Sequence, residues 1–223
     1  MSFNVKKYRI IDVSQWMHEF CFEGDQEFFT KGPFNRVAGN NPEFVYDFEL
    51  CSQSGTHIQG AHYFNQNGQK IESYPLESFE GQAWLFDLAK KGVDTTKNDL
   101  MGLIGDIELK AKIVIFRTGN MDGIIKTGKV DNQQRPGLSV DAARYLVLEK
   151  QVKMIAIDSL GIESRSSKNY EVNTWLCKHQ ILILEGLVNL QSITRQQVFL
   201  EAFPLKIKDV EGTPCRAIIK EAL

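Results

Sequence analysis

Gln53-Ser-Gly-Thr-His-Ile-Gln-Gly-Ala-His-Tyr-Phe64 is the most informative segment of the chain. It carries two imidazoles, His57 and His62, and two amides, Gln53 and Gln59. Imidazole is a good zinc ligand, whereas a neutral amide brings no charge and suits harder ions. The segment therefore has the residue types of a polar site, with few ligands for a transition metal.

The segment resembles the signature of the cyclase family of metal-dependent hydrolases, which includes kynurenine formamidases and isatin hydrolases. That signature runs approximately H-x-G-T-H-x-D-x-P-x-H-F. Residues 55–57 and Phe64 match it. Gln53 stands at the position of the first His, and Gln59 at the position of the Asp. The resemblance implies the family's fold and leaves its usual metal chemistry open.

Further segments between about Ile10 and Ile219 resemble family motifs in the same order. They are Gly68–Ile71, Tyr74–Glu77, Phe79–Gly81, Phe116–Gly119, Pro136–Ser139, Ile155–Asp158, Ile183–Glu185, Leu187–Leu190, Pro204–Ile207 and Gly212–Ala217. The resemblance implies an α/β fold of the swivelling β/β/α type with a mixed sheet. We expect residues 1–223 to form a single domain of this kind.

The resemblance also implies which residues stand at the family's metal centre. A downstream His and a Glu twelve residues later complete that centre, and Glu185 matches the Glu. Twelve residues upstream, 185 − 12 = 173, lies Asn173 and not His. The inherited set is Gln53, His57, Gln59, Asn173 and Glu185, of which three are neutral amides. We expect no cofactor, or a weak or lost zinc or manganese site held by His57 and Glu185.

The amides themselves indicate a polar pocket. A pocket filled in after a loss of function would more naturally contain Leu, Val or Ala. Buried amides must be hydrogen-bonded or hydrated, or they destabilise the fold. We therefore expect Gln53, Gln59 and Asn173 to bind a polar substrate. Drift among chemically similar codons would give the same pattern.

The position of the family's last His, its acid–base residue, has two candidates. A gapless register places Tyr63 there, and a one-residue deletion places His62 there. Successive strand residues point to opposite faces, so only one of the two can face the site. The distance to Gly68 favours Tyr63.

These residues support three functional hypotheses. In the first, an enzyme performs metal-independent acid–base chemistry on a small carbonyl, amide or lactam compound. His57 is then the base, Glu185 orients it, and Tyr63 or His62 donates a proton. The second is a conventional metal-dependent amidohydrolase of the arylformamidase type. The third is a non-catalytic homologue that binds a small molecule.

Composition narrows the possible partners. The chain has 223 residues, 43% hydrophobic and 24% charged, with a formal net charge of −2. Nothing in this balance favours nucleic acid or an anionic membrane. The four cysteines form no C-x-x-C pair, and no secretory leader is recognisable. We expect a cytoplasmic protein with a small-molecule substrate, and the resemblance implies a homodimer or homotetramer.

Hydrophobic patterns predict the elements that carry these residues. Predicted strands are residues 8–13, 43–50, 83–88, 112–117, 154–157, 181–184, 197–203 and 215–219. Predicted helices are residues 139–149, with Ser139 as N-cap, and residues 169–179. The stretch between the first two strands is predicted to be a loop. Its Phe28, Phe29 and Phe34 either line a pocket or pack beneath the loop.

Overall fold

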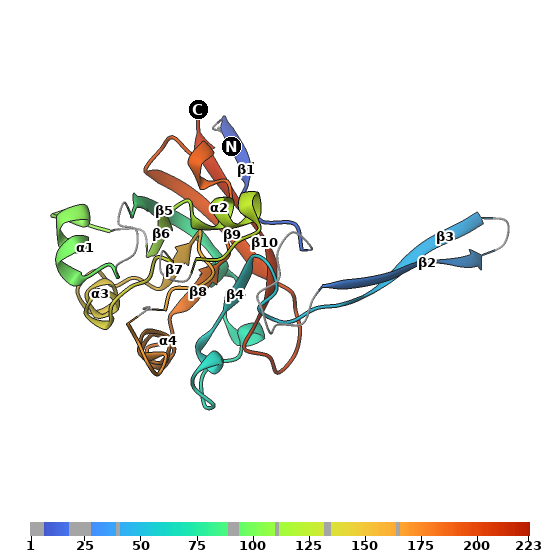
Figure 1. Cartoon of the computed structure of the whole chain (residues 1–223), viewed down its shortest axis with the longest axis horizontal. Coiled ribbons are helices and arrows are strands. Elements are labelled where there is room, and N and C mark those ends of the chain that lie inside the picture. The colour runs from blue at the N-terminus through green and yellow to red at the C-terminus, as the bar shows by residue number, and fades with distance from the viewer. Residues whose placement is uncertain are drawn as a thin grey trace, which may run out of the picture.

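A computed structural model describes residues 7–17, 28–38, 41–88, 94–109, 112–131, 135–163 and 166–223. Figure 1 shows a body of strands and helices from which one two-stranded arm projects. No helix of the described residues is long and apolar enough to cross a membrane. Cys51, Cys177 and Cys215 are free thiols, and Cys21 lies outside the described residues.

The strands of the described residues alternate irregularly with short helices. The strands are β1 (Tyr8–Asp12), β2 (Phe29–Ala38), β3 (Asn41–Glu49), β4 (His57–Gln59), β5 (Glu80–Asp87), β6 (Ile113–Arg117), β7 (Met154–Ile157), β8 (Leu182–Glu185), β9 (Gln197–Pro204) and β10 (Gly212–Ala222). The α-helices are α1 (Lys97–Ile104), α2 (Asn120–Thr127), α3 (Val140–Arg144) and α4 (Glu171–Lys178). Single turns of 3₁₀-helix span Ala61–Tyr63, Ile71–Ser73, Leu76–Phe79 and Leu190–Ser192.

The main sheet is mixed and closes on itself. Its order is β1-β10-β4-β8-β7-β6-β5-β9, and β9 also pairs with β10. The strands β10, β4, β8, β7, β6, β5 and β9 therefore form a closed barrel, and β1 extends β10 at one side. Strands β5 to β8 run parallel, and β4 runs antiparallel to β8. This confirms the predicted α/β fold with a mixed sheet.

Side-chain alternation divides the core into two layers. In β7, Met154 and Ala156 belong to the cluster inside the barrel, while Ile155 and Ile157 belong to the cluster shared with the helices. This alternation follows from the two-residue period of a strand. Ile58 and Leu184 point into the barrel. The residues on either side of them therefore face outward, toward the helices.

Most predicted elements are confirmed, since each predicted strand overlaps an observed one and residues 169–179 contain α4. The predicted helix of residues 139–149 begins correctly. After α3, however, the chain continues as a π-helical turn, Tyr145–Glu149. Ser139 precedes the helix without capping it, because its hydroxyl donates to the Thr95 carbonyl.

The predicted loop before residue 43 is wrong, because β2 pairs with β3 in a hairpin. Lys31 pairs with Asp47 and Phe34 with Val45, so the two residues between Lys31 and Phe34 oppose one residue of β3. This is a β-bulge, in which the Gly and Pro that suggested a loop are tolerated. Gly32 has a φ of 141°, which favours glycine.

Because the core is layered, replacing Leu by Ala should affect the free energy of unfolding very differently at a buried and at an exposed position. Leu184 is fully buried in the barrel, whereas Leu148 is 63% exposed. Leu184→Ala should lower the free energy of unfolding by about 2–5 kcal/mol, because it removes buried methyl groups and leaves a cavity. Leu148→Ala should change it by less than about 0.5 kcal/mol. Urea denaturation of both variants measures this, and equal effects would contradict the assigned layers.

Candidate functional site

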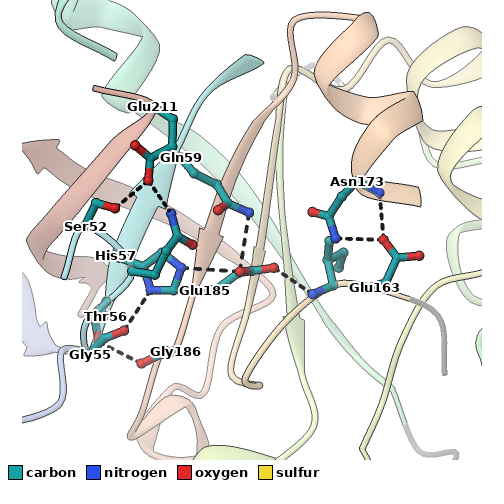
Figure 2. A network of polar contacts seen from close by, with 12 residues as sticks. Ser52, Gly55, Thr56, His57, Gln59, Glu163, Asn173, Glu185, Gly186 and Glu211 are labelled. Atoms are coloured by element: carbon teal, nitrogen blue, oxygen red, sulfur yellow. Dashed lines mark hydrogen bonds and ion pairs between the residues drawn. The ribbon is translucent and has the colours of Figure 1, made fainter. Parts of the chain in front are cut away.

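His57 and Glu185 lie directly opposite each other on the antiparallel strands β4 and β8. Cross-strand partners share a face, and here that face is the one turned away from the barrel interior. His57 Nε2 lies 3.3 Å from Glu185 Oε2, and both residues are 5% exposed. Figure 2 shows this contact at the centre of a polar network. The pairing of two strands thus brings together two residues that are 128 positions apart in the sequence.

The other nitrogen of His57, Nδ1, contacts a backbone carbonyl, and this contact orients the ring. Nδ1 lies 2.9 Å from the carbonyl oxygen of Gly55. A carbonyl only accepts, so Nδ1 carries a hydrogen, and Nε2 is the nitrogen left to exchange a proton. Nε2 approaches Glu185 without the alignment of a hydrogen bond. The partner that orients the imidazole is therefore Gly55, whereas Glu185 sits beside the reactive nitrogen.

Glu185 is held from two sides. Its Oε1 accepts the backbone N–H of Ile162 at 2.7 Å, in the loop between β7 and α4. Its Oε2 accepts the Nε2 amide of Gln59 at 3.4 Å. The short bond from Ile162 holds Oε1, and Oε2, which has only the long bond from Gln59, is the oxygen that faces His57.

Thr56 connects the two strands just beside this pair. Its hydroxyl donates to the carbonyl of Gly186 at 2.7 Å and accepts the backbone N–H of Gln15 at 3.0 Å. Gly186 directly follows Glu185, and its φ of 70° favours glycine. Each residue of the Gly-Thr-His motif thus has a role: the glycine orients the ring, the threonine fixes the strand, and the histidine meets the carboxylate.

The two amides of the 53–59 segment each donate to a carboxylate. Gln53 Nε2 donates to Glu211 Oε1 at 3.1 Å, and Gln59 Nε2 donates to Glu185 at 3.4 Å. Glu211 also accepts the hydroxyl of Ser52. A carboxylate only accepts, so it fixes which end of an amide faces it.

Asn173 is held in the same way by Glu163. The side-chain Nδ2 of Asn173 donates to Glu163 Oε2 at 2.7 Å, and the Asn173 backbone N–H donates to the same oxygen at 2.9 Å. Glu163 Oε1 accepts the backbone N–H of Val172. Glu163 therefore has two roles: it accepts backbone N–H groups in the first turn of α4, and it orients the side chain of Asn173 (Figure 2). Both residues are buried.

This arrangement leaves acceptor atoms without partners. Gln59 Oε1, Asn173 Oδ1 and His57 Nε2 are buried and accept no hydrogen bond. An unpaired buried acceptor costs about 1–3 kcal/mol, so such atoms call for a donor from a ligand or water. The candidate site consequently presents acceptors held in place by carboxylates.

Tyr63 and His62 lie on the 3₁₀ turn Ala61–Tyr63, not on a strand. The strand rule used for choosing between them therefore does not apply, because β4 ends at Gln59 and a 3₁₀ turn has about three residues per turn. Burial raises the pKa of the Tyr63 phenol far above its ordinary value, and the charge of Glu185 raises it further. The phenol of Tyr63 therefore lies within electrostatic range of the Glu185 carboxylate. His62 is half-buried, and its Nδ1 has no partner.

Sequence reasoning missed the supporting carboxylates Glu163 and Glu211 and the backbone N–H of Ile162. A usable signal existed for Glu163, which follows a glycine-containing loop after a buried parallel strand. In parallel α/β arrangements, closed barrels included, sites lie at this carboxyl end of the strands. No comparable signal exists for Glu211, which is brought to Gln53 only by the pairing of β10 with β4.

The donor set does not fit the zinc centre that the family resemblance implies. Of the five inherited positions, only His57 and Glu185 supply imidazole or carboxylate, whereas zinc usually takes at least three such protein ligands. Within the described residues, no group of three or more His, Cys, Asp or Glu side chains is arranged to hold a metal ion. The nearby carboxylates instead bind the amides.

Comparison with known proteins decides the family. The sequence profile of the Cyclase family matches residues 10–164. The chain belongs to the cyclase family. It is 27% identical over 222 residues to a kynurenine formamidase of Erythrobacter litoralis, covering 96% of this chain and 94% of that protein. It is 28% identical over 192 residues to Cyclase-like protein 3 of Oryza sativa, covering 83% of this chain and 67% of that one.

Solved structures of this cyclase family show the same fold. Isatin hydrolase A from Labrenzia aggregata superimposes with a TM-score of 0.83 at 19% identity, covering 97% of this chain and 94% of that one. A structure described as a potential metal-dependent hydrolase with cyclase activity gives a TM-score of 0.77 at 25% identity, covering 97% and 100%. The eight-stranded sheet with its closed barrel is thus the family fold.

The role of Thr56 can be tested with an isosteric variant. Thr56→Val should lower the free energy of unfolding by about 1–3 kcal/mol, because it leaves the Gln15 backbone N–H unpaired and removes one of the two donors to the Gly186 carbonyl. Thr174→Val, on an exposed position of α4, is the matched control and should change it by less than about 0.5 kcal/mol. Chemical denaturation of both variants measures this. A Thr56→Val protein as stable as its control would show that Thr56 does not tie β4 to β8.

Proposed function

We propose that this cyclase-family protein is a hydrolase-like enzyme that acts on a small amide, lactam or related carbonyl compound. Its reaction proceeds by proton transfer at His57 and Glu185 and requires no metal ion. The observation that carries the proposal is the buried contact between His57 Nε2 and Glu185 Oε2, surrounded by amides in place of metal ligands. The likeness to kynurenine formamidases and isatin hydrolases supports the substrate class.

The acceptor character of the site supports a substrate that carries N–H groups. Gln59 Oε1 and Asn173 Oδ1 are buried and unpaired, and the Glu185 and Glu163 carboxylates hold the opposite ends of these amides. An amide or lactam N–H donates to such oxygens, whereas a carboxylate ligand would be repelled. Gln53 is assigned to the same substrate-binding set from the position that the family resemblance gives it, and its bond to Glu211 fixes the direction of its amide.

The pair supplies the proton chemistry. Two bare acceptors 3.3 Å apart repel each other, so the contact is favourable when one proton lies on either His57 or Glu185. The pair therefore takes up a proton from the substrate or from an attacking water and returns it to the leaving group. Such positioned acid–base groups each contribute roughly 10²–10⁴-fold to a rate. A rate enhancement of this size is sufficient for cyclisation, dehydration or opening of an activated lactam.

Tyr63 supplies the donor at the carbonyl oxygen. With its pKa raised by burial and by Glu185, the phenol keeps its proton throughout the neutral range. A protonated phenol donates a hydrogen bond to a carbonyl oxygen as negative charge develops there. His62 takes this role only if the alternative register is correct.

Substitutions at these positions test the roles. On a panel of N-aryl formamides and isatin-type lactams, His57→Ala and Glu185→Gln should each lower kcat by about 10²–10⁴-fold, because either change removes the proton-sharing pair. Tyr63→Phe should lower kcat more modestly, by roughly 10-fold or more, through loss of one donor. His62→Ala tests the alternative register, because it should retain full turnover if Tyr63 is the donor and lose turnover if His62 is.

Two outcomes would contradict this assignment. Full turnover in His57→Ala, Glu185→Gln and Tyr63→Phe would show that these three residues are not catalytic. If no member of the panel is converted while one binds with micromolar affinity, the protein is a small-molecule-binding homologue and not an enzyme.

Metal independence is tested by elemental analysis and by restoring the missing ligands. Protein purified without chelator or added metal should contain well under one zinc or manganese ion per chain, because the site offers one imidazole and one carboxylate. The triple variant Gln53→His, Gln59→Asp and Asn173→His should bind zinc at least 10²-fold more tightly by titration calorimetry. The matched control, the exposed change Gln151→His, should bind no more tightly than the unaltered chain.

One equivalent of metal with activity lost to chelator would establish the conventional metal-dependent amidohydrolase instead. A triple variant without added zinc affinity would show that these residues do not occupy the inherited ligand positions.

A further inference from the structure

Three carboxylates of the candidate site bond to neutral donors and, among the described residues, pair with no lysine or arginine. They are Glu163, Glu185 and Glu211. Elsewhere in the described structure, carboxylates such as Asp12 and Asp87 each form an ion pair with an arginine. Negative charge gathered in a largely buried site without a basic side chain attracts a positively charged ligand.

Glu211 is the carboxylate of the three whose charge is least offset. Glu163 accepts N–H groups at the N-terminus of α4, where the helix dipole favours negative charge. Glu185 shares a proton within the pair that it forms with the imidazole. Glu211 has neither compensation: its Oε1 accepts two neutral donors, and its Oε2 accepts no hydrogen bond from a described residue. Since Glu211 is half-buried, this oxygen is within reach of a ligand.

A buried acceptor lies on the strand next to Glu211. The backbone carbonyl of Glu211 accepts the N–H of Gly60 at 2.8 Å, and Gly212 pairs with Gln59 (Figure 2). A Cβ at Gly212 would approach the Gln59 Cβ to 3.0 Å, so a glycine gives the amide side chain room. Gln59 is 1% exposed, and its Oε1 has no partner. An unpaired buried acceptor near a free carboxylate oxygen favours a ligand that brings both N–H donors and positive charge.

Aromatic rings lie next to Tyr63. The Phe64 ring meets the Tyr63 ring edge-on with centroids 4.5 Å apart, and the Tyr170 ring with centroids 5.3 Å apart. Tyr170 is 58% exposed and has a φ of 52°, a left-handed conformation that is unusual for so large a side chain. Besides burial, the charges of Glu185 and Glu211 raise the pKa of the Tyr63 phenol, so both carboxylates act at this position. The faces of such rings attract cations.

We propose that Glu211 selects substrates that carry an ammonium group, which binds at its Oε2. This inference rests on the proposed function, because it names the substrate class of the same site. The substrate is then a small amide, lactam or related carbonyl compound with a positively charged amine. Its N–H groups meet two kinds of acceptor, the carboxylate of Glu211 and the unpaired amide oxygen of Gln59. A compound that carries a carboxylate in place of the amine is repelled.

Three formanilides that differ mainly in charge test the proposal. The unaltered chain should bind para-aminomethyl formanilide, a cation, at least ~10-fold more tightly than neutral para-ethyl formanilide of the same size, because hydrogen bonds to a charged group are the stronger ones. The anion para-carboxy formanilide should bind most weakly. Titration calorimetry measures all three affinities, and kcat/KM should follow the same order for the compounds that are converted.

A matched pair of carboxylate variants assigns the charge selection to one residue. Glu211→Gln should lower the preference for the cation over the neutral compound at least ~10-fold, because it removes the negative charge. Glutamine keeps the size of the side chain and one accepting oxygen, so Gln53 keeps a partner. Glu77→Gln is the control, since it removes an exposed carboxylate from the turn Leu76–Phe79 and should leave the preference unchanged.

The proposal is overturned if the unaltered chain binds the cation no more tightly than the neutral compound, the absence of any binding included. It is also overturned if Glu211→Gln keeps the preference, or if Glu77→Gln loses it to the same extent. The comparison of the three compounds on the unaltered chain uses no substitution, so it decides the matter even if Glu211→Gln fails to fold. Selective binding of the cation without any turnover would support this inference and contradict the proposed enzymatic function.

Discussion

The contact between His57 and Glu185 organises the candidate site, and it exists only because β4 pairs with β8 in one register. A shift of β4 by one residue would turn His57 into the barrel, where Ile58 now packs, and leave Glu185 without it. Thr56 resists such a shift, because its hydroxyl joins the residue before His57 to the residue after Glu185. The Gly-Thr-His motif therefore acts first on strand register and only then on chemistry.

The amides at the inherited ligand positions are part of a built network. Gln53, Gln59 and Asn173 each donate to a carboxylate, and each carboxylate fixes the direction of its amide. Random drift would not be expected to place a matching acceptor beside three separate amides. The result is a site whose outward atoms are acceptors, in a fold whose relatives include proteins named kynurenine formamidase and isatin hydrolase. The proposed acid–base reaction uses the imidazole and carboxylate for proton transfer and the amides for binding the substrate.

Much of the fold could be predicted from the sequence, because buried parallel strands such as residues 113–117 and 154–157 are short apolar runs between polar ends. The closeness of His57 and Glu185 followed from the family resemblance. The hairpin strand β2 was missed because Gly32 and Pro33 usually mark loops, and a bulge is recognisable only from pairing. The role of Gly55 as the partner that orients His57 depends on a backbone carbonyl, which leaves no signature in side-chain types.

The state of the His57 ring tests the central claim most directly, namely that a proton and not a metal ion occupies the contact with Glu185. Nitrogen-15 NMR of ring-labelled histidine, with His57 assigned by comparison with His57→Gln, reports on both nitrogens. The account predicts a protonated Nδ1 bonded to Gly55 and an Nε2 resonance that does not move with one equivalent of zinc. A shift of Nε2 to a metal-bound position at one equivalent of zinc would contradict it.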